Sequence, residues 1–289
     1  MASSVSNTVV FAEDWSVKLQ EMLDEPNKFK EICEVVFTRA RVFNNPYLTD
    51  ATVQTLQKNT PYTYQPVVET NETVTVNTHR HLAQLMDRAD LAQSGYARQM
   101  YLAERQGILL NEAIETAVYA NHGNCTDFGA GDITGGTVAD TTTITVSATN
   151  VDDIVRHVER VILVANGGSF LGRNGGFILW RPADREKLWG FMQANGFVEA
   201  DKALSSNPNQ GVRYMGFNHY TSNLLAANHL MAGVNKLSHV YILPDTYGQI
   251  VVDEKDPNST SGVSVNSRVD FKEKVWANFK PVMLDINVA

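Results

Sequence analysis

The sequence predicts an α+β fold, and three observations lead to this prediction. A helical pattern of apolar residues extends from Asp90 to about Asn121. Residues 62–77 are rich in Thr, Tyr and Val and alternate in the way that is typical of β-strands. After Asn150, helical and strand patterns follow each other without the regular strand–helix repeat of a parallel α/β sheet.

Length and composition fit one large or two modest folded domains. The chain has 289 residues, of which 43% are hydrophobic, enough apolar side chains for a full core. The longest apolar runs, such as Gly107–Leu110, are far shorter than the ~20 residues that cross a bilayer, so we expect no membrane span. The sequence has no visible secretory signal and two cysteines that do not form a disulfide framework, so the expected compartment is the cytosol of a cell.

The charge pattern bears on nucleic-acid binding. The formal net charge is −8, and no segment of the chain is basic. An acidic surface repels phosphates, so the sequence carries no electrostatic footprint for sequence-independent DNA binding.

The N-terminal region begins with about twelve small and polar residues, which predict an unpatterned arm. A helical pattern then extends from Asp14 to Leu23 and ends at Pro26. The next pattern predicts a second short helix that buries Phe29, Ile32, Val35 and Val36.

A β-hairpin is predicted within residues 62–77. The runs Tyr62–Val68 and Thr73–Val76 flank a polar segment, Glu69–Glu72, which predicts the turn. These runs contain few large aliphatic side chains, so the hairpin has little to bury by itself. We therefore expect it to project from the fold and to find its partner elsewhere.

The long helical pattern is the strongest local signal. Asp90 with Gln93 resembles a capping pair, and Gly123 is a suitable C-terminal stop. At 1.5 Å per residue such a helix is about 45 Å long. One face of it is apolar at spacings of three and four, at Tyr96, Met100, Ala103, Gly107, Leu110, Ile114 and Ala117.

The remainder alternates loops, helices and short strands. A loop or an edge hairpin is predicted over 129–143, and helices are predicted to begin at Asn150 and Pro182. A buried stripe is predicted on the first of these helices at Val151, Ile154, Val155, Val158 and Ile162. Strands are predicted at 177–180, 240–243, 249–252 and 282–288, with a surface loop at 256–262.

The sequence motifs predict no catalytic, cofactor-binding or metal-binding residues. The glycine-rich segment 167–176 lacks the Lys-Ser/Thr ending of a phosphate-binding loop, which favours a plain surface loop. His79 and His81 alternate and share a strand face, but no third ligand lies near them in the sequence. Cys33 is expected to be a buried, inert thiol, whereas Cys125 falls in a predicted loop and is a candidate for exposure.

Four segments carry a resemblance to a known family. Leu85–Ser94 resembles the entry to the spine helix of phage coat proteins, and the stretches 102–104 and 111–114 resemble the helix itself. Arg213–Leu224 resembles a late strand-turn of these proteins, and Pro281–Val288 resembles their closing strand. With the order of elements, these segments resemble the Hong Kong 97-like fold of tailed-bacteriophage major capsid (coat) proteins.

The resemblance implies a division of the chain into five segments. These are an N-terminal arm at 1–44, an E-loop at 45–88, a peripheral domain with the spine helix at 89–150, an axial domain at 151–245, and a return to the peripheral domain with the C-terminal strand at 246–289.

The resemblance also implies a structural role rather than an enzymatic one, without cofactors. Hexamers and pentamers of the chain would form an icosahedral shell in a virion, assembled in the host cytoplasm and enclosing double-stranded DNA without specific binding. Portal and decoration proteins are implied partners. Because no long charged helix precedes the arm, we also expect a separate scaffolding protein.

Some relatives join their subunits through an E-loop lysine. Here residues 59–88 contain no lysine, and Lys58 is expected at the base of the hairpin, so we expect no such crosslink. Two other functions stay open: an encapsulin-type compartment shell, and a soluble α/β enzyme that uses His79 and His81 or the 167–176 segment.

Overall fold

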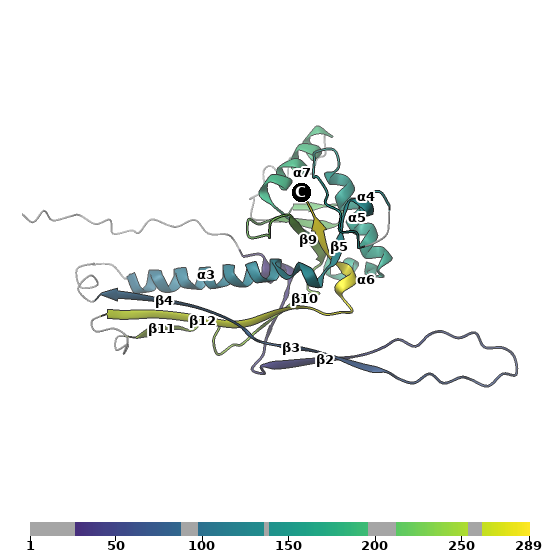
Figure 1. The fold of residues 1–289 in the computed structure, drawn as a ribbon, viewed down its shortest axis with the longest axis horizontal. Coiled ribbons are helices and arrows are strands. Elements are labelled where there is room, and N and C mark those ends of the chain that lie inside the picture. The colour runs from purple at the N-terminus through teal and green to yellow at the C-terminus, as the bar shows by residue number, and fades with distance from the viewer. Residues whose placement is uncertain (1–26, 88–97, 136–138, 196–211, 254–261) are drawn as a thin grey trace, which may run out of the picture.

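The computed structural model describes residues 27–87, 98–135, 139–195, 212–253 and 262–289. The predicted helix at 14–23, the predicted cap at Asp90 and Gln93, and most of the predicted loop at 256–262 lie outside these ranges. Within them the chain forms an elongated part and a rounded part, each built on its own sheet (Figure 1).

The elongated part contains a five-stranded sheet with one long helix along it (Figure 1). Its strand order is β1-β10-β12-β11, and β4 also pairs with β12. The strands are β1 (Glu34–Phe37), β4 (Thr78–Asp87), β10 (Ser238–Ile242), β11 (Ile250–Asp253) and β12 (Gly262–Val275), and the helix is α3 (Arg98–Tyr119).

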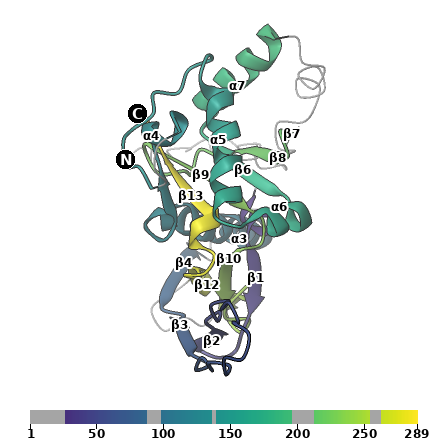
Figure 2. The same ribbon diagram turned by 90° about the vertical axis from the view of Figure 1, so that its right-hand side faces the viewer.

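The rounded part contains a six-stranded sheet in the order β5-β13-β9-β6-β8-β7. Its strands are β5 (Thr126–Phe128), β6 (Gly176–Trp180), β7 (Val212–Tyr214), β8 (Phe217–Thr221), β9 (His229–Val234) and β13 (Met283–Asn287). Its helices are α4 (Ala130–Ile133), α5 (Val151–Val164), α6 (Gly168–Asn174) and α7 (Pro182–Ala194). Figure 2 shows α5 and α6 in front of β6 and β9, on one face of this sheet.

The helix α3 forms where the long apolar pattern predicts it. Leu110, Ile114 and Val118 recur every four residues and are buried in the main core. The amide of Gln106 is also buried and donates hydrogen bonds of 3.0 Å to the Gln84 side chain and to the Val265 carbonyl. These two bonds fix α3 to β4 and β12, so apolar and polar contacts both hold the helix on the sheet.

Several predicted elements of the rounded part are confirmed. All five predicted stripe residues of α5 are buried, as is the whole of β6. Pro182 occupies the first turn of α7. The predicted strand-turn is the hairpin of β7 and β8, whose two turn residues, Met215 and Gly216, both have positive φ.

Three short segments differ from the prediction. Val35 and Val36 were predicted on a helix, but they lie in β1, which pairs in parallel with β10, while the helix α1 covers only Phe29–Ile32. The β-branched pair favours a strand once a sheet edge is available. The predicted loops at 167–176 and 129–143 contain the helices α6 and α4, which high glycine content concealed.

The predicted hairpin at 62–77 is wrong in its pairing. The strand β3 (Glu69–Thr75) pairs with β2 (Val42–Leu48), so the predicted turn at 69–72 lies inside a strand and residues 49–68 form one long loop. The Asn-Asn-Pro sequence within β2 is typical of a turn. Pro46 is tolerated because a two-stranded ribbon has only edge strands, where a missing N–H can face outward.

The pair β2–β3 is here called the ribbon, and its base is fixed to the five-stranded sheet. Val74 and Val76 are buried with Tyr241 and Trp276, and the ring centroid of Phe43 lies 4.9 Å from that of Tyr241. Polar contacts add to this: Glu72 pairs with Lys274 at 2.6 Å and accepts a 3.0 Å hydrogen bond from the Ala277 N–H. Beyond these contacts the ribbon extends away from both sheets (Figure 1).

The two sheets divide the chain differently from the five predicted segments. β5, from segment 89–150, and β13, from segment 246–289, both join the sheet of the rounded part. β10, from segment 151–245, joins the sheet of the elongated part. The role of the segments in a shell stays a prediction. Among the described residues, no helix is long and apolar enough to cross a membrane.

A buried histidine in the rounded part makes stability depend on pH. The Trp180 indole donates a 2.8 Å hydrogen bond to His219 Nδ1, so Nε2 carries the proton toward the Tyr214 carbonyl, 3.1 Å away. Burial lowers the pKa of His219 to about 4. Because this value lies below that of the unfolded chain, the contribution of His219 to stability is complete above pH 6.5. It is lost as the pH falls from 6.5 to 4.

We predict that His219→Gln reduces the loss of unfolding free energy between pH 7 and pH 5 by about 2 kcal/mol relative to the wild type. Urea denaturation at the two pH values measures this difference. The exposed His81→Gln serves as the control and should keep the wild-type pH dependence. Equal losses in all three proteins would contradict the prediction.

We also predict that Glu72→Gln loosens the ribbon, because it weakens the ion pair with Lys274 and the bond from the Ala277 N–H. Loss of ~1 kcal/mol would raise amide hydrogen exchange in β2 and β3 about fivefold without changing exchange in the rounded part. Glu69→Gln, an exposed position on the same strand, should leave exchange unchanged. Unaltered exchange in Glu72→Gln would show that the apolar contacts alone hold the ribbon.

Candidate functional site

One of the two histidines singled out from the sequence, His79, belongs to a surface ion network. His79 Nδ1 lies 2.8 Å from Asp270 Oδ1, and Arg268 contacts both oxygens of the same carboxylate at 2.8 Å. Burial alone would raise the pKa of Asp270, but the hydrogen bonds from Arg268 and His79 lower it. His81 pairs in register with Arg268 on the neighbouring strand. A cation beside this carboxylate disfavours a metal ion there, and no metal-ligating group of three in the described ranges includes either histidine.

The glycine-rich segment 167–176 is mostly helical and is not the plain surface loop that the sequence favours. Residues 168–174 form the short helix α6, where the Leu171 N–H bonds to the Gly167 carbonyl and the Gly175 N–H bonds to the Leu171 carbonyl. The segment covers the sheet of the rounded part instead.

Both thiols are inert by burial. Cys33 and Cys125 are buried, and burial raises the pKa of each to about 12. The expectation for Cys33 is confirmed. The candidate exposure of Cys125 is wrong, because the segment after α3 folds back as η1 (Asn121–Asn124) and β5 and covers the side chain.

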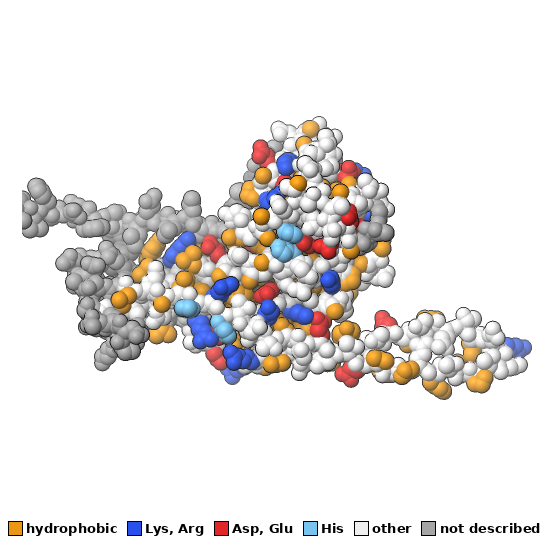
Figure 3. All heavy atoms as spheres, viewed as in Figure 1, with side chains coloured by type: hydrophobic (Ala, Val, Ile, Leu, Met, Phe, Trp, Pro, Cys, Tyr) orange, Lys and Arg blue, Asp and Glu red, His pale blue; other side chains and the backbone are white. Residues whose placement is uncertain are grey.

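The most unusual surface is the loop that closes the ribbon, residues 49–68, here called the ribbon loop. Its two limbs are held together by the Gln65 side chain, which bonds both the N–H and the carbonyl of Thr52 at 2.9 and 2.8 Å. Val53, Tyr64 and Val67 are 96%, 90% and 80% exposed. Figure 3 shows apolar side chains along this projection. So many exposed apolar groups on one extended segment mark an interaction surface.

Lys58 lies at the tip of the ribbon loop and not at its base. It forms a turn with Asn59, midway between the ends of β2 and β3. Figure 3 shows a basic side chain at the far end of the projection. The predicted basal position of Lys58 is therefore wrong, while the absence of a covalent crosslink stays a prediction.

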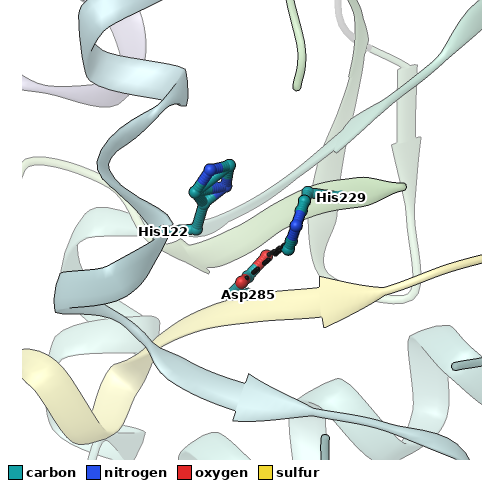
Figure 4. Close-up of side chains that lie close together, drawn as sticks. All are labelled: His122, His229 and Asp285. Atoms are coloured by element: carbon teal, nitrogen blue, oxygen red, sulfur yellow. Dashed lines mark hydrogen bonds and ion pairs between the residues drawn. The ribbon is translucent and has the colours of Figure 1, made fainter. Parts of the chain in front are cut away.

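A second group of polar side chains lies where α3 meets the rounded part. His122 comes from η1, His229 from β9 and Asp285 from β13, and one potential ligand atom from each lies within 4.8 Å of the others (Figure 4). His229 Nδ1 is 2.9 Å from Asp285 Oδ1, and the two imidazole centroids are 4.1 Å apart. Burial lowers the pKa of His122, Asp285 partly offsets this effect, and His229 lowers the pKa further.

Sequence reasoning missed this cluster. The three residues are far apart in the chain and match no short ligand motif. His229 and Asp285 become neighbours only through the antiparallel pairing of β9 with β13. Figure 3 shows histidine side chains at the surface on the boundary between the two parts of the molecule.

Comparison with known proteins finds similarity in structure alone. No protein-family model and no curated protein matches the sequence. A solved chain of Mycobacterium phage Che8 aligns with a TM-score of 0.69 and 13% identity, covering 97% of this chain and 98% of that one. The capsid of Ralstonia phage GP4 aligns with a TM-score of 0.68 and 8% identity, covering 100% and 98%.

A virus-like particle from Pyrococcus furiosus is also similar, with a TM-score of 0.58 and 11% identity over 91% of this chain and 92% of that one. The similarity to the phage chains extends over nearly the full length of both chains. The chain therefore has the Hong Kong 97-like fold found in phage capsids.

Proposed function

We propose that this chain is a major capsid protein of a tailed bacteriophage, which assembles as hexamers and pentamers into an icosahedral shell around double-stranded DNA. The observation that carries the proposal is the full-length fold similarity to phage capsid chains. The exposed ribbon loop supports it independently, because a free subunit leaves this apolar surface in water.

Association through the ribbon loop has a clear physical basis. Covering one exposed side chain of the size of Val67 contributes about 1.5–3 kcal/mol, so several such side chains favour contact with a second copy. Because each copy carries the same surface, a closed ring repeats the same contact between every pair of neighbouring subunits, and the stabilisation adds up.

The surface charge suits a container for DNA. The net charge is −8, and positive and negative side chains are interspersed on the face shown in Figure 3. A net acidic chain without a basic segment repels phosphates, which agrees with packaging without specific binding. The proposed location is the virion after assembly in the host cytoplasm, and a separate scaffolding protein, a portal and decoration proteins are the proposed further partners.

A second candidate is a cellular compartment shell of the encapsulin type. The fold similarity to the virus-like particle from Pyrococcus furiosus supports this second candidate function. The two functions differ in what the shell contains: DNA for a capsid, and cargo protein for a compartment.

The deciding experiment is electron microscopy of the full chain, expressed alone and with candidate scaffolding proteins, followed by analysis of the particle contents. Closed shells made of five- and six-membered rings are expected, with nuclease-protected DNA in particles from infected cells. Protein cargo in place of DNA would favour the compartment. A monodisperse monomer or dimer under all conditions would contradict both shell functions.

We predict that the double variant Tyr64→Ser/Val67→Ser raises the concentration required for assembly at least tenfold, because it removes apolar surface from the ribbon loop. Light scattering against protein concentration measures this threshold. The matched control, Tyr64→Phe/Val67→Ile, keeps the apolar surface and should assemble like the wild type. Circular dichroism should be the same for all three proteins, since the positions lie outside both cores. An unchanged threshold in the serine variant would show that the ribbon loop does not drive assembly.

A further inference from the structure

The cluster of His122, His229 and Asp285 has the donor set of a transition-metal site. Two imidazoles and one carboxylate are a common ligand set for Zn²⁺, with a fourth position open to water. Ca²⁺ and Mg²⁺ prefer ligand sets made of oxygen alone, so the two nitrogen donors favour a softer divalent ion.

The geometry requires only small movements. The three potential ligand atoms lie within 4.8 Å of one another, whereas tetrahedral ligands about 2.1 Å from zinc lie about 3.4 Å apart. His229 and Asp285 already lie at contact distance on neighbouring strands. His122 stands on the short helix η1 and is half-buried, so rotation of its side chain can bring its ring nitrogen to the pair (Figure 4).

The surroundings also suit a bound ion. Asp285 is 5% exposed, so its carboxylate lies in a setting of low polarity where attraction to a cation is strong. Tyr119, Leu225 and Leu230 line the same hollow and limit the access of water. The two imidazole rings also lie next to each other, with their centroids 4.1 Å apart, so both can supply a nitrogen to the same hollow.

The surface contains a similar pair that lacks one donor. His79 Nδ1 lies 2.8 Å from Asp270 Oδ1, but Arg268 occupies both carboxylate oxygens and no second imidazole adjoins them in the described part of the chain. This pair therefore provides a matched comparison within the same protein.

We propose that His122, His229 and Asp285 bind one Zn²⁺ or a similar divalent transition-metal ion per chain. The ion joins η1, which directly follows α3, to β9 and β13 of the six-stranded sheet. It therefore ties the end of the long helix to the rounded part of the molecule. Binding displaces any proton held on the liganding nitrogens into solvent.

The test uses the full chain without a polyhistidine tag, in subunit form, titrated with ZnCl₂ in a calorimeter. One equivalent is expected to bind with micromolar or tighter affinity and to raise the melting temperature. His122→Gln and His229→Gln should each weaken binding at least tenfold, whereas His79→Gln should bind like the wild type. Co²⁺ should give the absorption of a tetrahedral site in the wild type and lose it in His122→Gln.

His122→Gln is the decisive variant because its side chain is half-buried on a short surface helix, so the fold is expected to be retained, as circular dichroism can verify. Asp285 is buried, and Asp285→Asn is therefore a supporting variant only. Absence of binding by the wild type, or equal binding by His122→Gln and His229→Gln, would overturn the proposal. Neither result depends on whether the chain forms shells.

Discussion

The strand β12 is the element on which the elongated half of the molecule depends. It pairs with β10, β11 and β4, and its Val265 carbonyl accepts the hydrogen bond from Gln106 of α3. Lys274, near its end, holds Glu72 of the ribbon. The sheet, the long helix and the projecting ribbon are therefore all positioned by one strand. A disruption of β12 would separate elements that are distant in the chain.

Elements with one buried face were predictable from the sequence. The buried stripe of α5 and the apolar strand β6 follow directly from periodicity, because each buries a continuous set of apolar side chains. β12 was not predicted, since Ser264, Ser267 and Asp270 interrupt its apolar pattern although all three are buried. Asp270 is accommodated there by Arg268, two residues earlier on the same strand, and by His79 of β4, which is a contact that no local pattern contains.

The ribbon shows a different limit of prediction. That a polar, Thr-rich segment would project was a sound inference, because it had too little apolar surface to bury. Its pairing partner was misjudged, since the Asn-Asn-Pro sequence of β2 indicates a turn and twenty residues separate the two strands. The His122–His229–Asp285 cluster could not be predicted for a related reason: it needs the pairing of β9 with β13 and the position of η1 beside them.

The length of the ribbon has a mechanical consequence. Seven residues in each strand and about ten in each limb of the loop, at ~3.3 Å per residue, place Lys58 roughly 50 Å from the base. At that radius, a rotation of about 10° at the contacts of Phe43 moves the tip by roughly 9 Å. A slight repacking at the base of the ribbon would therefore move its tip by a large distance and change the surface that the tip contacts. In the proposed shell, such a movement would let identical chains contact neighbours at different angles between subunits, without a change in either sheet.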